Sequence, residues 1–308
     1  MKTTGLTFIL ALFFAVGNIS DAGAQTWMKR LGEKAEEAAK RKVEKKVEEK
    51  VDEAVERAFD KTEESIRKER KESGSRTPVV EPPDTGEPAE NSSDWDNNEP
   101  YYALKKGARI EYTVYNGSGK VQGYNKQEVL KITRSGNSVE AVVSGMQTDS
   151  KGKVQNTATV SLRYKNGNFH VNLLEMMPLQ GLENAEIDAN MSGNDMIIPS
   201  KLSPGQILPD AEATFKMRIS DGSDAADLPP LVFHIYNRRA VRAESVETPM
   251  GKFVCFKIIQ TVEADYPLIG TQQATGITWI GKGIGVVKSE TYDAKGKLTN
   301  RMLLTGLE

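Results

Sequence analysis

The sequence has little of the chemistry from which catalytic and metal sites are built. Among its 308 residues it has one cysteine, Cys255, and two histidines, His170 and His234. A lone cysteine excludes a disulfide within the chain, so the fold has to rest on its hydrophobic core. Neither histidine has other ligands at the spacing of a metal site. We therefore expect both histidines to be structural, and we expect no metal or cofactor.

The remaining nucleophile and phosphate motifs are weak. Cys255 and His234 would act together only if the fold brought them into contact, and the apolar run of residues 253–256 predicts instead a buried thiol. Residues 281–285, Gly-Lys-Gly-Ile-Gly, do not complete a phosphate-binding loop, because no predicted helix follows them. The sequence therefore favours a protein that is not an enzyme, with a hydrolase as the least favoured alternative.

The first 24 residues have the pattern of a cleavable signal peptide. Lys2 precedes an almost wholly apolar run over residues 5–17, and Ala22 and Ala24 stand at the positions that determine cleavage. No later segment reaches the ~18 apolar residues of a transmembrane helix. We expect an exported chain that begins at Gln25. The periplasm is the favoured compartment, and an extracellular or surface-associated location is the alternative.

Residues 25–71 predict one long charged helix, and residues 72–100 predict a disordered linker. The helical segment consists mostly of Ala, Glu, Lys, Arg and Val, and its apolar residues recur nearly every fourth position. This spacing drifts around a straight helix, so it does not give a heptad seam. A solvated spacer, a homo-oligomer formed through residues 27–70 and a membrane-surface helix are the alternatives. The linker contains five prolines among acidic and polar residues, and such a composition cannot bury a core.

Residues 101–308 alternate between apolar and polar side chains, as residues 110–114 illustrate. Turn sequences at residues 166–167 and 293–297 would join neighbouring strands. We predict one mainly β domain of about ten to twelve strands, folded as an antiparallel rolled sheet, half-barrel or barrel. Residues 176–209 contain four methionines and four prolines, and we interpret them as a loop with one short helix.

Two of the later predicted strands are apolar on both faces. In residues 231–236 and 253–259 the two alternating sets of side chains are both largely apolar. Because a sheet turns only one face to its core, the other face would meet a covering element, a partner or an apolar ligand. The side chains that we expect to contact such a ligand are Val232, Tyr236, Phe253 and Ile259. The formal net charge of −2 gives no basic surface for nucleic acid.

Two C-terminal stretches carry a family resemblance. Residues 248–258, Thr-Pro-Met-Gly-Lys-Phe-Val-Cys-Phe-Lys-Ile, resemble a strand of exported β-domain proteins of Bacteroidota, the TapB-like and related domain-of-unknown-function proteins. The residues of the second stretch that resemble these proteins are Trp279, Gly283, Gly285, Val286, Lys288, Glu290, Tyr292 and Gly-Lys-Leu at 296–298. The resemblance covers roughly residues 101–308. It implies a periplasmic or surface β-roll or half-barrel, distantly similar to the LolA lipoprotein carriers, and it carries over no catalytic residue.

These features together favour an exported envelope protein whose β-domain binds or scaffolds. Its partner would be an apolar ligand or another envelope protein. The alternative is a periplasmic carrier that holds a lipid-like ligand in the concavity of a half-barrel.

Overall fold

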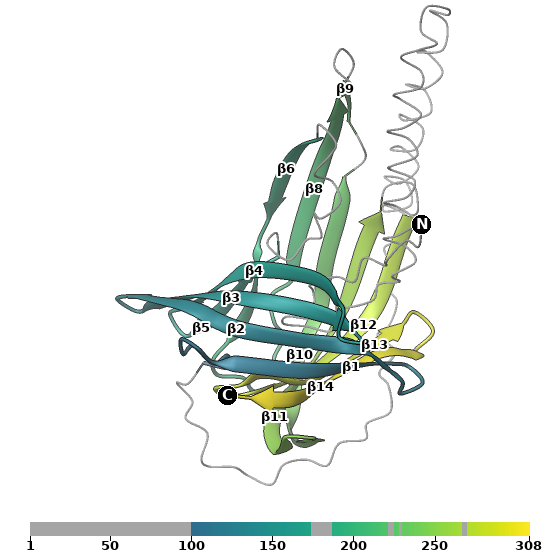
Figure 1. Cartoon of the computed structure of the whole chain (residues 1–308). Coiled ribbons are helices and arrows are strands. Elements are labelled where there is room, and N and C mark those ends of the chain that lie inside the picture. Colours follow the sequence, from purple (N-terminus) through teal and green to yellow (C-terminus); the bar gives the residue numbers. More distant parts are fainter. Residues whose placement is uncertain (1–99, 174–186, 221–224, 228–229, 267–269) are drawn as a thin grey trace, which may run out of the picture.

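The structure is a computed structural model of the chain (Figure 1). It describes residues 100–173, 187–220, 225–227, 230–266 and 270–308. The predicted signal peptide (residues 1–24), the charged helix (25–71), residues 72–99 of the linker and the methionine-containing residues 176–186 lie outside the described residues. Within the described residues, no helix is long and apolar enough to cross a membrane.

The described residues form fourteen strands in one antiparallel sheet, which confirms the predicted fold class. In chain order the strands are β1 (Arg109–Asn116), β2 (Val121–Ser135), β3 (Ser138–Asp149), β4 (Val154–Lys165), β5 (Asn168–Asn172), β6 (Ile187–Gly193), β7 (Asp195–Pro199), β8 (Ala211–Ser220), β9 (Ala225–Asp227), β10 (Leu231–Thr248), β11 (Gly251–Tyr266), β12 (Gly270–Gly281), β13 (Gly285–Asp293) and β14 (Leu298–Leu307). Across the sheet the order is β6-β8-β10-β11-β12-β13-β14-β1-β2-β3-β4-β5-β7, and β9 pairs with β8.

Three of the hairpins use the same five-residue turn. In each, the side-chain oxygen of the first residue, Asn116, Asp149 or Asp293, accepts hydrogen bonds of 2.9–3.1 Å from the backbone N–H groups two and four residues later. The fourth residue is a glycine with φ between 76° and 80° in all three turns, a conformation that suits glycine. The predicted Asn166-Gly167 hairpin is also confirmed, with φ of 51° and 74°.

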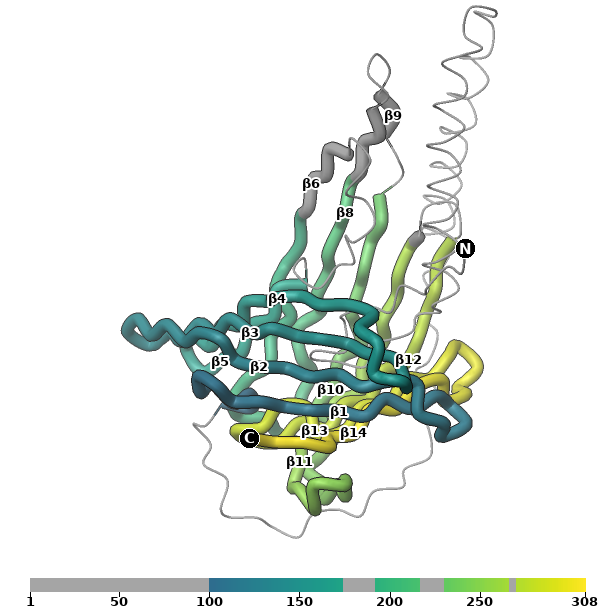
Figure 2. The backbone as a smooth tube through the Cα atoms, in the orientation of Figure 1, coloured from purple at the N-terminus to yellow at the C-terminus, as the bar shows by residue number. Residues whose placement is uncertain are grey.

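The sheet nearly closes on itself, because consecutive strands stand at its two ends. Strand β6 ends just before Asn194 and strand β7 begins just after it, yet the two strands occupy opposite ends of the strand order. The two edges therefore have to approach each other at this residue. The Asn194 side chain accepts a hydrogen bond from the Glu212 N–H at 2.6 Å and donates one to the Asp210 carbonyl at 3.3 Å. The path of the chain also places β14 beside β1 (Figure 2).

Arg238 on β10 ties this junction together from inside. Its guanidinium is fully buried and donates to the carbonyls of Ile197 on β7, at 3.1 Å, and of Pro209, at 2.6 Å. It also donates to the Gln260 side chain at 3.3 Å. Burial lowers the pKa of Arg238 to about 10, against the opposing effect of Asp210, so the group remains charged at neutral pH. The buried Arg238 side chain thus connects β7 to β10, although these two strands are not paired with each other.

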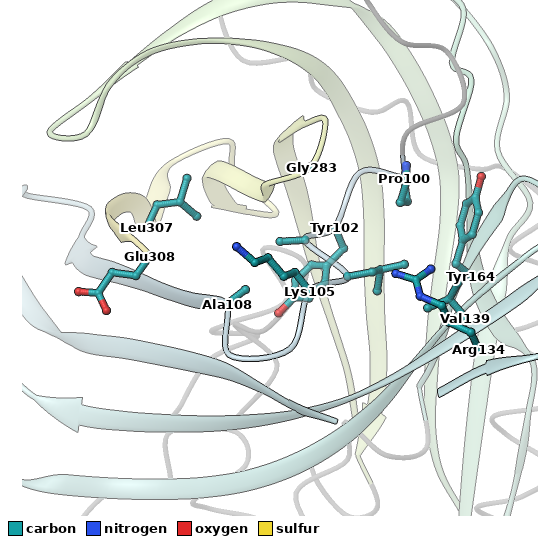
Figure 3. Close-up of a pocket in the computed structure, with 12 residues that line it drawn as sticks. Pro100, Tyr102, Lys105, Ala108, Arg134, Val139, Tyr164, Gly283, Leu307 and Glu308 are labelled. Carbon is teal, nitrogen blue, oxygen red and sulfur yellow. The ribbon is translucent and has the colours of Figure 1, made fainter. Parts of the chain in front are cut away.

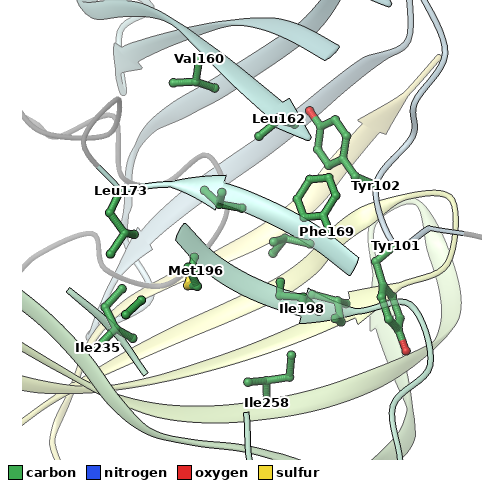
Figure 4. Close-up of a cluster of buried hydrophobic side chains, with 14 of the residues drawn as sticks. Tyr101, Tyr102, Val160, Leu162, Phe169, Leu173, Met196, Ile198, Ile235 and Ile258 are labelled. Atoms are coloured by element: carbon green, nitrogen blue, oxygen red, sulfur yellow. The ribbon is translucent and has the colours of Figure 1, made fainter. Parts of the chain in front are cut away.

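The main hydrophobic core lies between two parts of the sheet. Strands β1–β4 cross β8, β10 and β11 at a steep angle in Figure 1, and the buried side chains in Figure 4 fill the space between the layers. Tyr101 and Tyr102, just before β1, belong to this core and are 4% and 2% exposed. The Tyr102 ring stacks on Phe169 with centroids 5.9 Å apart. The domain core therefore begins at least eight residues before its first strand.

The interpretation of residues 176–209 as a loop with a short helix is wrong for residues 187–199. These residues form β6 and β7, and Met196 and Ile198 alternate into the core with exposures of 0% and 3%. Neither strand pairs with its sequence neighbour, since β6 pairs with β8 and β7 with β5. Without a hairpin turn between paired strands, the local sequence lacks the signal that identifies the other strands. Pro199 stands at the end of β7, where a proline is tolerated.

Candidate functional site

The apolar second face predicted for residues 253–259 belongs to a separate hydrophobic cluster, whereas that predicted for residues 231–236 does not. The buried members of this cluster are Val246, Cys255, Ile259, Ile277, Trp279 and Val287. They come from β10, β11, β12 and β13, and they are distinct from the main core. Strand β10 also comes within 8 Å of β13 and β14, with which it shares no hydrogen-bonded ladder. The sheet therefore curls around this second cluster.

Charged side chains surround Trp279 at the edge of the second cluster. The indole N–H donates to the carboxylate of Glu244, which also accepts from Arg242 Nε at 3.0 Å. The ammonium groups of Lys288 and Lys257 lie 4.3 and 5.6 Å from the centroid of the indole ring. Glu244 and Lys257 are only 2% and 6% exposed. Because these groups satisfy one another, they have the character of a structural network rather than of an open site.

Glu290 on β13 forms the second half of this network. Its carboxylate is 3.1 Å from Lys288 Nζ and 2.8 Å from Arg301 Nε, and it accepts a hydrogen bond of 2.6 Å from the Tyr292 hydroxyl. Burial alone would raise the pKa of Glu290, but the charge of Lys288 and the hydrogen bonds from Tyr292, Lys288 and Arg301 outweigh it and hold the pKa below its ordinary value. Glu290 is therefore a carboxylate at neutral pH and a fixed negative charge.

A pocket of about 500 Å³ opens where the chain enters the domain (Figure 3). Its walls come from the segment before β1, the ends of β2, β3 and β4, the loop between β12 and β13, and the end of β14. The apolar and aromatic part of the wall is formed by Tyr102, Leu104, Val139, Tyr164 and Leu307, with Ala103 and Ala108 between them. Lys105, Arg134 and Glu308 supply the charges. The pocket is thus amphipathic.

The wall that carries Tyr102 is held firmly. The Gly283 N–H donates to the Pro100 carbonyl at 3.0 Å, and the Tyr102 hydroxyl donates to Gln127 Oε1 at 3.1 Å. Gly285, with φ of 99°, lies against the tyrosine ring so closely that a Cβ there would be 2.9 Å from ring carbon Cδ2. A glycine is therefore required at this position for the ring to pack. These contacts fix the position of the Tyr102 ring in the pocket wall.

Residues 105–304 match the family model described as DUF3108-like. The chain belongs to the DUF3108-like family. This confirms the resemblance to exported β-domain proteins of unknown function. Part of the pocket wall, including Tyr102, Leu104 and Leu307, lies just outside the matched residues.

Solved structures share the fold of this DUF3108-like domain. A protein from Bacteroides fragilis, described as exported and with a YmcC-like fold, is 22% identical, and the match covers 68% of this chain and 99% of that one with a TM-score of 0.54. A protein from Parabacteroides distasonis, described as a lipoprotein, is 19% identical over 68% and 99% of the two chains, with a TM-score of 0.55. No significant match is found among curated proteins.

The four residues predicted to face a ligand lie in two different places of the DUF3108-like domain. Val232 and Tyr236 are half-buried on β10, where the tyrosine hydroxyl donates to Glu263 at 3.1 Å. Ile259 is a buried member of the second cluster, and Phe253 packs half-buried against both clusters. None of the four is among the residues that line the pocket in Figure 3. Their contact with a ligand stays a prediction.

The fold separates the residues considered for catalysis. His234 is paired with a β11 residue eight positions beyond Cys255, which at ~3.3 Å per residue is about 26 Å along the strand. Burial, with a contribution from Glu244, raises the pKa of the Cys255 thiol. His170 Nδ1 is 3.4 Å from an Asp195 carboxylate oxygen. In the described part of the chain, no three or more His, Cys, Asp or Glu residues gather in a way that would hold a metal ion.

The pocket has no signature in the local sequence. Its wall is assembled from six segments that are up to about two hundred positions apart, so no local pattern marks it. The one signal in the sequence was the pair of tyrosines at 101–102, which directly follow a polar, proline-containing stretch. Two consecutive aromatic residues at the start of a domain indicate an anchored segment, but they do not say what it encloses.

Proposed function

We propose that this chain is an exported envelope protein whose DUF3108-like domain binds an apolar or amphipathic ligand, without catalysis, in the pocket of Figure 3. The observation that carries the proposal is the pocket itself. Its volume of about 500 Å³ falls within the ~300–1,000 Å³ typical of small-molecule sites. Its lining combines a mainly apolar wall with a few charged groups, which is also typical of such sites.

Export is supported by two independent features. The first 24 residues have the three-part pattern of a signal peptide. Two solved structures with the same fold belong to proteins described as exported or as a lipoprotein. We propose the periplasm as the compartment, with an extracellular or surface-associated location as the alternative.

Binding without catalysis is supported by the state of the one thiol. A reactive cysteine needs a low pKa and access to solvent. Cys255 is fully buried, its pKa is raised, and the β10–β11 register keeps His234 far from it. A carrier of lipid-like molecules is the form of this function that the amphipathic lining favours.

Native mass spectrometry of the mature chain, purified gently from envelopes of its own host, tests the proposal. We expect a bound mass of lipid size that leaves on activation. Ala103→Trp, which fills the pocket from its wall, should reduce the bound fraction at least about tenfold. The control variant Thr159→Trp introduces the same side chain at an exposed position and should leave the bound fraction unchanged. A bare wild-type protein, or equal retention by Ala103→Trp, would count against ligand binding in this pocket.

A further inference from the structure

We propose that the ligand of this pocket carries an anionic group, a carboxylate or a phosphate, held by Lys105 and Arg134. This inference rests on the proposed function and adds the charge of the ligand to it. Both side chains line the pocket, and both are exposed. In Figure 3 they lie on either side of Tyr102. They come from two segments of the lining, the one before β1 and the end of β2.

Neither cation has an acidic partner among the described residues. Lys105 and Arg134 make no ion pair in the part of the chain that the structure describes, whereas their neighbour Arg109 has two acidic partners. Glu308, the one acidic residue that lines the pocket, is 3.8 Å from Arg109 Nη1. Among the described residues, the lining therefore carries two cations without an acidic partner and one exposed carboxylate, which is near Arg109. Its charge is complementary to a ligand with a negative head.

The remaining wall determines what is attached to that head. The half-buried side chains of Leu104, Val139, Tyr164 and Leu307 present aromatic and aliphatic surface. Such surface favours a hydrocarbon chain, and each methylene that it buries contributes about fourfold in affinity. The planar guanidinium of an arginine binds a carboxylate or a phosphate through two parallel hydrogen bonds, and a lysine adds a point charge. The occupant that fits is a single-chain amphiphile with an anionic head.

Calorimetric titration of the mature chain, residues 25–308, with four ten-carbon probes tests the inference. The probes are decanoate, decyl phosphate, decan-1-ol and decyltrimethylammonium, each kept below its micelle concentration. We expect at least one anion to bind about tenfold or more tightly than the alcohol, and the cation to bind most weakly. The stronger of the two anions identifies the head as carboxylate or phosphate.

Reversing the charge of Arg134 tests whether this residue causes the preference for anionic probes. Arg134→Glu should reduce the affinity for the anion by about tenfold or more and leave that for decan-1-ol within about twofold. Lys165→Glu changes the charge equally one residue beyond Tyr164, at an exposed position that does not line the pocket. This control should bind all four probes as the wild type does.

The outcomes separate the inference from the function beneath it. Equal binding of alcohol and anions, unchanged in Arg134→Glu, would overturn the anionic head and leave an apolar pocket intact. An anion preference lost equally in Lys165→Glu would reflect general surface charge and would also overturn the site. Failure of all four probes to bind would remove the proposed function together with the inference.

Discussion

Glu290 shows how a buried charge is kept in the second face of the sheet. Its carboxylate has three partners, Lys288, Arg301 and Tyr292, within 3.1 Å. Because these partners hold its folded-state pKa below the ordinary 4.5, the carboxylate stabilises the fold when it is ionised. This contribution is fully present above about pH 4.5 and is lost as the pH falls through the depressed folded-state value.

Glu290→Gln should therefore lower the free energy of unfolding at pH 7 by about 2 kcal/mol, because charge-assisted hydrogen bonds are lost in a buried setting. It should also flatten the decline of stability below about pH 4.5, since the titrating group is gone. Urea unfolding at a series of pH values between 3 and 7 measures both effects. A variant that keeps the wild-type slope in acid would show that other carboxylates cause the decline.

A matched exposed ion pair provides the control. The Glu111 carboxylate lies 2.6 Å from Lys126 Nζ, but both side chains are nearly half exposed. Such pairs contribute ~1 kcal/mol or less. Glu111→Gln should therefore leave the unfolding free energy at pH 7 within about 0.5 kcal/mol of the wild type.

At the scale of elements, the shared hairpin turn gives a test of local sequence control. Asp293 accepts hydrogen bonds from the N–H groups of Lys295 and Lys297, both at 2.9 Å. Asp293→Ala removes the one oxygen that accepts both hydrogen bonds and should lower the unfolding free energy by about 1 kcal/mol. Asp293→Asn keeps an oxygen in place, as Asn116 does in the first hairpin, and should cost less than half as much. Equal losses in urea unfolding would show that charge, rather than the turn hydrogen bonds, is responsible.

The difference between local turn sequences and long-range strand pairing explains how much of the fold was predictable. Hairpins such as the one at Asn166-Gly167 are encoded by a few adjacent residues, so alternation and turn sequence identify them. The β6 and β7 strands are not, because Met196 and its neighbours become a strand only through pairing with a distant β5. The burial of Cys255 was predicted from its apolar neighbours and holds. The contacts of Trp279 with Glu244 and Lys288 could not be predicted, because they depend on the register between neighbouring strands, which no local pattern gives.

At the scale of the molecule, the sheet joins the start and the end of the domain. Strand β14 pairs with β1 from Ile110 to Asn116, so the first and last strands depend on each other. The residues before β1 are part of the same unit, because Tyr101 and Tyr102 are buried and Pro100 is bonded to the loop between β12 and β13. The folded domain therefore needs its chain from residue 100 onward.

Two truncations test this boundary. A chain of residues 100–308 should unfold with the same free energy as the chain of residues 25–308, which lacks the predicted signal peptide, since both keep the two tyrosines. A chain of residues 109–308 loses them and should be destabilised by more than about 5 kcal/mol, because removing one large buried aromatic side chain already costs ~3–5 kcal/mol. Urea unfolding compares the three. Equal stability of the two truncated chains would contradict the role given to the segment before β1.

The chains of residues 25–308 and 100–308 also test whether residues 27–70 form a homo-oligomer. If these residues form a homo-oligomer, the mature chain should have a multiple of the monomer mass in solution, and the chain of residues 100–308 should be a monomer. Light scattering coupled to size exclusion measures both masses. Monomers in both cases would instead support the solvated spacer, because the predicted helix, with its drifting apolar stripe, would offer no continuous seam to a partner. An oligomer that survives the truncation would place the interface on the β-domain.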